Sequence, residues 1–173
     1  MIIKSFELEK IKTLNFNVHL IYGNNEGVKQ DIIENYYLKS FEGEILKYDE
    51  QEILNNKEEF LSSLLTKSLF EANKIIIISR ATDKLTDVVS EIIEKIEIET
   101  KIIIKCSNLE KKSKLRNLIE KEKKEVCTPV YEDDTRALNI LINNFLKEKK
   151  FNLSQEIKNI LIERSKGDRI NLK

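Results

Sequence analysis

The segment Lys74-Ile75-Ile76-Ile77-Ile78-Ser79 decides the fold that this sequence predicts. Four consecutive isoleucines leave no polar face, so a strand made from them must be covered on both sides. Strands of this kind occur in parallel sheets that carry helices on each face. The segment therefore predicts a central strand of a parallel sheet.

Strand and helix patterns alternate around this segment as far as about residue 130. The expected strands are 17–22, 44–48, 74–79, 100–105 and 126–130. The expected helices are 28–38, 51–66, 81–96 and 109–124, each with apolar residues at three- and four-residue spacing. This alternation is typical of a doubly wound, mostly parallel α/β domain.

Beyond Asp133 the sequence shows helix patterns alone. The two apolar stripes expected to face a core are Ala137, Ile140, Leu141 and Phe145, and then Ile157, Ile160, Leu161 and Ile162. Ser154 is the expected N-cap of the second helix. We therefore expect an α/β domain over 1–134 and the start of a helical domain over 135–173. Two helices seldom form a stable domain, so the second region is expected to be truncated.

Composition excludes several classes of function. The 30 Lys and Arg balance the 30 Asp and Glu, so the whole molecule has no field that attracts nucleic acid. One His and two Cys do not provide a structural zinc site, and no metal or other cofactor is expected. No signal peptide or membrane-spanning run is visible. We expect a cytoplasmic protein without membrane contact, with Cys106 and Cys127 buried or idle and His19 structural within its strand.

The loop after the first strand lies where a phosphate-binding loop would lie. In the pattern GxxxxGK[ST] counted from Gly23, the second glycine is replaced by Val28, the lysine position holds Lys29, and the Ser/Thr position holds Gln30. Valine disfavours the backbone that wraps phosphates, and glutamine is a poor substitute for the hydroxyl that binds magnesium. We expect this degenerate loop not to bind nucleotide, and Lys29 to be a solvated helix residue.

Other catalytic groupings are lacking in the sequence. The strand that ends at Ser79 is followed by Arg80, where a working ATPase needs an acidic residue. Consecutive acids such as Glu58-Glu59 and Asp133-Asp134 are expected to be solvated. No Ser-His or Cys-His arrangement supplies a nucleophile and base. No catalytic residue is therefore named.

The residues alone leave two alternatives open for each of two further segments. Leu69-Phe70 precedes the isoleucine strand, and it either fills a core corner or forms an exposed apolar plug for a partner. The run Lys111, Lys112 and Lys114 is either a solvated part of a lysine-rich helix or lies near DNA phosphates.

The chain resembles the N-terminal part of the delta subunit of bacterial DNA polymerase III, a clamp-loader family. The resemblance covers nearly the whole chain in order. It rests on the segments Leu20–Glu26, Ser68-Leu69-Phe70 with Lys74, Leu109–Leu115 and Ile162–Asp168.

This resemblance implies an AAA+/RecA-like fold that is followed by a helical lid and that binds no nucleotide. The family's collar domain has no counterpart in this sequence. It implies that Leu69 and Phe70 enter an apolar pocket of the β sliding clamp, which the subunit opens for loading onto primed DNA. The implied partners are the clamp, the ATPase and delta-prime type subunits, and DNA through the assembly. The chain would then be an accessory subunit of a DNA-directed DNA polymerase, a nucleotidyltransferase, without an active site of its own.

Two alternatives remain open. The strand-loop-helix at Gly23 also fits a divergent P-loop NTPase or small-molecule kinase that uses Lys29. A helicase- or repair-associated AAA+ relative with another partner is the third possibility.

Overall fold

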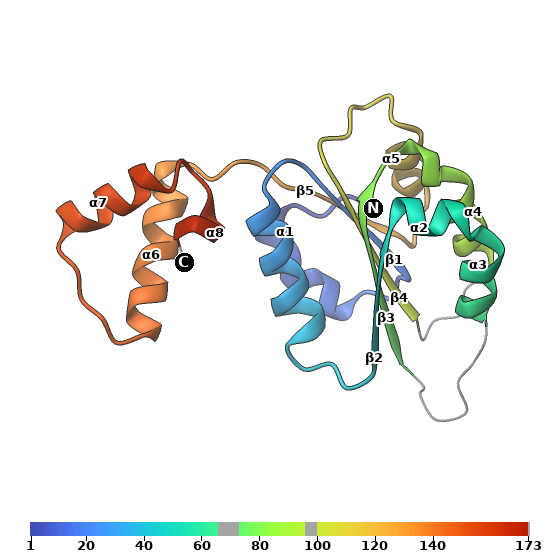
Figure 1. Cartoon of the computed structure of the whole chain (residues 1–173), viewed down its shortest axis with the longest axis horizontal. Helices are drawn as coiled ribbons and strands as arrows, with labels where there is room; N and C mark the ends of the chain where they lie inside the picture. The colour runs from blue at the N-terminus through green and yellow to red at the C-terminus, as the bar shows by residue number, and fades with distance from the viewer. Residues whose placement is uncertain (66–72, 96–99, 173) are drawn as a thin grey trace.

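The structure is a computed structural model of the whole chain and describes residues 1–65, 73–95 and 100–172. Its centre is a five-stranded parallel sheet with the strand order β2-β3-β4-β1-β5 (Figure 1). The strands are β1 (Val18–Tyr22), β2 (Glu44–Asp49), β3 (Lys74–Ala81), β4 (Thr100–Cys106) and β5 (Val126–Pro129). The predicted doubly wound parallel α/β fold is confirmed.

Helices cover both faces of this sheet. The helical elements are η1 (Ser5–Thr13), α1 (Glu26–Ile33), η2 (Glu34–Leu38), α2 (Glu50–Asn55), α3 (Lys57–Leu65), η3 (Asp83–Leu85), α4 (Thr86–Lys95), α5 (Lys114–Lys121), α6 (Thr135–Glu148), α7 (Gln155–Arg164) and α8 (Arg169–Leu172). In Figure 1, α1 lies on one side of the sheet and α2 to α5 lie on the other. The last three helices, α6 to α8, lie beyond α1 at one end of the molecule.

The isoleucine strand divides its side chains between two apolar clusters. Ile76 and Ile78 pack with the helices α2 to α5. Ile75 and Ile77 pack on the opposite face with η1 and α1. All four are at most 5% exposed, which is the burial on both faces that the unbroken apolar run predicts.

Several expected helices begin or end elsewhere. The helix predicted over 51–66 is interrupted at Asn56, and the one predicted from residue 81 begins later because β3 extends to Ala81. The helix predicted over 109–124 shortens to α5, since Ser113 caps its first turn. The predicted 28–38 helix ends in the π-helical turn η2. Residues 5–13, which have no clear period in the sequence, form the 3-10 helix η1.

The C-terminal helical segment (α6 to α8) has a small core that the sequence predicts only in part. Its buried side chains are Leu138, Ile142 and Ile162, and of these only Ile162 belongs to a predicted stripe. Ile140 and Ile160, expected to face a core, are 53% and 50% exposed. The buried stripe of α6 is Leu138 and Ile142, because these are the side chains that face α7 and α8. Ser154 does cap α7, as predicted.

Candidate functional site

The loop between β1 and α1 closes tightly against the end of β5. Gly23 has a φ of +135°, and a Cβ atom there would lie 2.0 Å from the carbonyl oxygen of Val130. The backbone amide of Val130 in turn donates to the carbonyl of Tyr22 at 2.8 Å. Only glycine fits at this position, because both the positive φ and the close approach exclude a side chain.

Lys29 is buried beneath this loop, at 1% exposure. Its ammonium donates to the carbonyl oxygens of Gly23 and Cys106, each at 2.8 Å, and lies 2.5 Å from a carboxylate oxygen of Glu26. Two of the three N–H donors of the ammonium thus bind backbone carbonyls, and the Glu26 carboxylate balances its charge. The expectation that Lys29 is a solvated helix residue is therefore wrong. Lys29 lies on the same buried face of α1 as Ile32 and Ile33. Its side chain therefore points toward the carboxyl ends of β1 and β4.

The other two positions of the degenerate loop also have internal partners. The amide of Val28, which lies at the start of α1, donates to the side-chain oxygen of Asn25 at 3.0 Å. Gln30 points along the helix surface and donates to Glu34 at 2.7 Å. The helix start is thus capped by a side chain of the protein itself.

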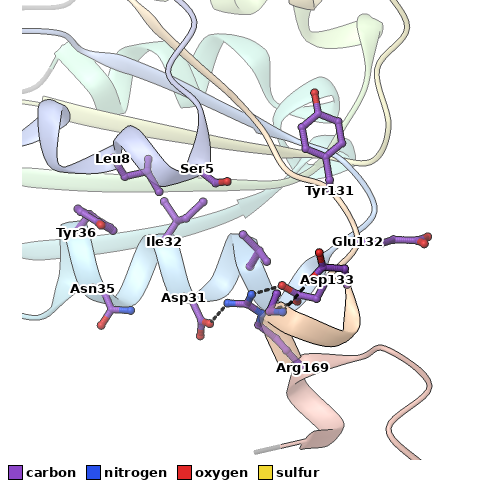
Figure 2. A pocket seen from close by; sticks show the side chains of 13 residues that line it. Ser5, Leu8, Asp31, Ile32, Asn35, Tyr36, Tyr131, Glu132, Asp133 and Arg169 are labelled. Atoms are coloured by element: carbon purple, nitrogen blue, oxygen red, sulfur yellow. Dashed lines mark hydrogen bonds and ion pairs between the residues drawn. The ribbon is translucent and has the colours of Figure 1, made fainter. Parts of the chain in front are cut away.

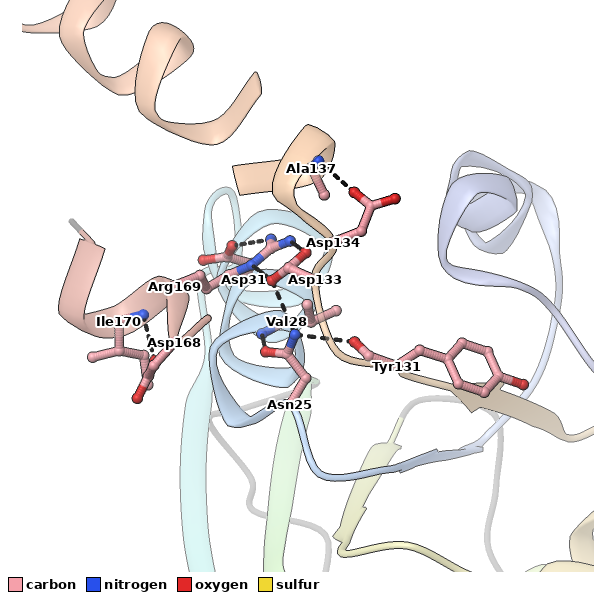
Figure 3. A network of polar contacts seen from close by, with 10 residues as sticks. All are labelled: Asn25, Val28, Asp31, Tyr131, Asp133, Asp134, Ala137, Asp168, Arg169 and Ile170. Atoms are coloured by element: carbon pink, nitrogen blue, oxygen red, sulfur yellow. Dashed lines mark hydrogen bonds and ion pairs between the residues drawn. The ribbon is translucent and has the colours of Figure 1, made fainter. Parts of the chain in front are cut away.

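A polar network joins this loop to the C-terminal helical segment (Figures 2 and 3). Arg169, the first residue of α8, donates through Nε to Asp133 at 2.7 Å and through Nη1 to Asp31 at 2.8 Å. Its Nη2 forms an ion pair with the other oxygen of Asp133. Asn25 donates to the same Asp133 at 2.9 Å and to the carbonyl of Tyr131 at 3.0 Å.

The Arg169 guanidinium is held in a largely enclosed position. Its side chain is 17% exposed, and those of Asp31 and Asp133 are 18% and 7% exposed. Burial by itself raises the pKa of the Asp133 carboxyl, but hydrogen bonds from Arg169 and Asn25 outweigh it, so this pKa lies below its ordinary value. The prediction of a solvated Asp133-Asp134 pair is wrong for Asp133, while Asp134 caps α6.

Gly27 lets α8 approach α1 closely. A Cβ atom at this position would lie 2.3 Å from Cγ of Arg169 and 3.2 Å from a side-chain carbon of Ile170. The glycine of this loop thus serves contact with the protein's own C-terminal segment.

The cations around the loop are consequently neutralised by nearby acids. Lys29 has Glu26, and Arg169 has Asp31 and Asp133. Arg80, at the end of β3, has Asp49 as its ion-pair partner. No group of His, Cys, Asp or Glu suited to a metal ion occurs within the described part of the chain. The arrangement ties segments of the chain together and offers no paired acid and base for chemistry.

The remaining titratable candidates are structural. His19 is fully buried between the hydroxyl groups of Tyr37 and Thr128, and burial lowers its pKa to about 3. Cys106 and Cys127 are free thiols at 1% and 0% exposure, and burial raises the pKa of each to about 12. The expectation of a structural histidine and buried thiols agrees with these surroundings.

The partner-binding residues predicted from the sequence fall in different places. Leu69 and Phe70 lie outside the described residues. Lys111 and Lys112 lie in the loop before α5, Lys114 is its first residue, and all three are exposed. Lys112 lies 3.0 Å from Glu110, so part of this local charge is offset.

Sequence reasoning missed the Asp31, Asp133 and Arg169 network. Asp31 and Arg169 stand 138 residues apart, so no local spacing connects them. The available signals were Lys29 at helical spacing from two buried isoleucines, and an arginine directly after the Gly167-Asp168 turn.

The fold of this chain is shared by several solved structures. Comparison of the sequence with models of protein families gives no match, and comparison with curated proteins gives none either. Solved structures do match. The Bacillus subtilis DNA clamp loader delta protein (YqeN) is similar over 97% of this chain and 54% of its own, with a TM-score of 0.66 and 13% identity.

Two further solved structures share this fold. A variant of Thermotoga maritima RuvB matches over 97% of this chain and 56% of its own, with a TM-score of 0.57 and 16% identity. A gamma subunit-related protein of DNA polymerase III from Thermotoga maritima matches over 82% of this chain and 50% of its own, with a TM-score of 0.52 and 13% identity. The chain thus spans about half the length of these proteins. The resemblance to the delta subunit is confirmed at the level of the fold.

Within the described residues, no helix combines the length and apolar character that crossing a bilayer requires.

Proposed function

We propose that this chain is the N-terminal part of a clamp-loader subunit of the delta type. It binds and opens the β sliding clamp for loading onto primed DNA, within an assembly of ATPase and delta-prime type subunits, and hydrolyses no ATP itself. The AAA+ fold shared with a clamp loader delta protein supports a clamp-loader-like role. The observation that supports the absence of nucleotide chemistry is Lys29, which is 1% exposed, donates to two backbone carbonyls and pairs with Glu26.

We propose that the chain divides into two domains between residues 134 and 135. The α/β domain over 1–134 carries the degenerate loop of Gly23, Val28, Lys29 and Gln30, and residues 135–173 begin a helical lid. Asp134 is the N-cap of α6, so the proposed boundary coincides with a helix start. Lys111, Lys112 and Lys114 are exposed and available to DNA phosphates in the assembly, although the neutral total charge gives them no support from the rest of the molecule.

We place the clamp contact at Leu69 and Phe70. The segment that contains them precedes Lys74, where β3 begins at the amino-terminal edge of the sheet. Burial of a leucine and a phenylalanine contributes about 1.5–3 kcal/mol each. Such a contact opens a ring only if it binds the open interface better than the closed one.

The test is a binding titration against the cognate β clamp. We expect the Leu69→Ala, Phe70→Ala double variant to bind about 100-fold more weakly or worse, because roughly 3–6 kcal/mol of apolar burial is lost and each 1.4 kcal/mol is tenfold. The matched control is Ile157→Ala, Ile160→Ala, which removes two side chains that are 45% and 50% exposed on α7. Equal affinity of the parent and the Leu69, Phe70 variant would contradict the proposal.

Calorimetry with ATP and magnesium separates the proposal from an NTPase or kinase. We expect no heat of binding at millimolar nucleotide. Binding that disappears in Lys29→Ala, with the fold checked by circular dichroism, would favour the enzyme instead.

A further inference from the structure

The C-terminal helical segment (α6 to α8) has its own small core, separate from the two clusters of the sheet domain. Where it faces α1, the structure has a pocket of about 550 Å³ whose lining includes Leu8, Ile32, Tyr36 and Ala137 (Figure 2). This pocket leaves a gap in the apolar packing beside the place where α8 approaches α1 at Gly27. Domains that share small interfaces move relative to one another unless another contact holds them.

Arg169 supplies that contact. Its side chain extends from α8 to two carboxylates on other elements. These are Asp31 on α1 and Asp133 in the connection before α6 (Figure 3). A guanidinium presents a planar fork of donors, so it can hold both acids in a fixed geometry where a lysine could not.

The surrounding backbone is shaped for this contact. Lys166 and Gly167 have φ values of +52° and +79°, and the turn they form directs the chain into α8. Asp168 accepts from the amide of Ile170 at 2.7 Å and fixes the start of that helix. On the other side, the missing side chain of Gly27 leaves room for Cγ of Arg169.

We propose that Asp31 and Asp133 act as a built-in anion for Arg169 and tie the helical segment to the sheet domain in one orientation without nucleotide. Of the two carboxylates, Asp133 lies next to Asn25, the N-cap of α1, where the start of a helix can also attract a phosphate, and Asp31 lies further along the same helix. Arg169 is thus a positioning residue that fixes the orientation of the helical segment relative to the sheet domain. The inference does not depend on clamp binding.

The test measures the distance between the two parts of the full chain. Spin labels are attached at Asn108→Cys, in the exposed loop after β4, and at Glu148→Cys, at the exposed end of α6. The native thiols of Cys106 and Cys127 are buried, which keeps them from competing for the label. We expect one narrow distance distribution, identical with and without magnesium-ATP.

The decisive variant is Arg169→Met, which should broaden the distribution at least twofold. Arg164→Met is the matched control, because it makes the same change at an exposed position of α7 and should leave the distribution unchanged. Asp31→Asn with Asp133→Asn keeps the shapes of the side chains and should broaden the distribution to the same extent. Adding Arg169→Met to that double variant should broaden it no further, because all three residues act in one contact.

Two results would overturn the inference. One is an Arg169→Met distribution as narrow as that of the parent. The other is a parent distribution that is broad alone and narrows on addition of magnesium-ATP. If Arg169→Met fails to fold, the two Asn substitutions decide alone, since a narrow distribution in that variant contradicts the proposed tie.

Discussion

The sheet domain and the C-terminal helical segment are held together by different forces. Every isoleucine of β3 is buried between helices, and the sheet carries a large apolar cluster on each face. The helical segment buries Leu138, Ile142 and Ile162, while Ile140 and Ile160 remain half exposed. Its attachment to α1 depends on an arginine between two carboxylates. Apolar burial therefore determines the fold of the first region, and charge determines the placement of the second.

The largest expected effect is a core truncation in the sheet. Ile103→Ala removes a side chain that is fully buried in β4 and should lower the free energy of unfolding by about 3 kcal/mol, through lost burial and a cavity. The matched Ile160→Ala, at 50% exposure on α7, should change it by less than about 0.5 kcal/mol. Urea denaturation measures both. Similar losses in the two variants would break the contrast between the regions.

Lys29→Met tests how much the buried ammonium beneath the loop between β1 and α1 stabilises the fold. The substitution keeps the length of the side chain but leaves the carbonyls of Gly23 and Cys106 without their charged donor. We expect a loss of roughly 1–3 kcal/mol in the free energy of unfolding. Lys112→Met, whose side chain is 86% exposed, is the control and should be nearly neutral. If the two variants are equally stable, the internal role assigned to Lys29 is wrong.

The two regions should also respond to acid at different pH. Burial lowers the pKa of His19 to about 3, so between the ordinary pKa of histidine and that value the unfolded chain binds a proton that the folded chain does not. The free energy of unfolding should therefore fall by about 1.4 kcal/mol per pH unit below about pH 6.5. Denaturation at pH 7, 6 and 5 measures the slope, and His19→Gln should flatten it.

Attachment of the helical segment should persist through that range. The pKa of Asp133 is below its ordinary value, so the stabilisation it provides is complete above the pKa of an unfolded Asp, about 3.9. This stabilisation is lost as the pH falls through the lower, folded value. The spin-label distance should thus stay narrow at pH 5. Broadening near pH 6 would show that another group controls the attachment.

The smallest expected effects come from a matched pair of helix caps. Ser113 is buried, caps α5 and donates to Asp83, and this hydrogen bond lowers the pKa of the Asp83 carboxyl. Ser154 caps α7 at the surface, with Ile157 N lying 3.4 Å from its hydroxyl. We expect Ser113→Ala to cost about 1–2 kcal/mol and Ser154→Ala about 0.5 kcal/mol. Thermal denaturation of both variants checks the order, and the reverse order would contradict it.

Sequence reasoning succeeded where the signal was local and failed where partners came from elsewhere. The isoleucine run of β3 fixed a doubly covered strand, and the alternation around it gave the parallel sheet. The ends of the helices and strands were predicted less accurately. The Ser113 cap and the extension of β3 to Ala81 depend on contacts with other parts of the fold. The predicted stripe of α6 was wrong and that of α7 was right only for Ile162, because short helices carry apolar residues on more than one side. Only the packing of the helices selects Leu138 and Ile142.

The amino-acid order alone determined that this chain forms a parallel α/β sheet with a loop that departs from the phosphate-binding pattern, since both follow from residue types at fixed spacing. Tertiary structure decided what became of the charges around that loop. Lys29 meets two backbone carbonyls, and Arg169 meets Asp31 and Asp133, only after β4, β5 and α8 have come together. A charged side chain has no preferred partner in a linear sequence, and its role is set by which opposite charge the fold brings within a few ångströms of it.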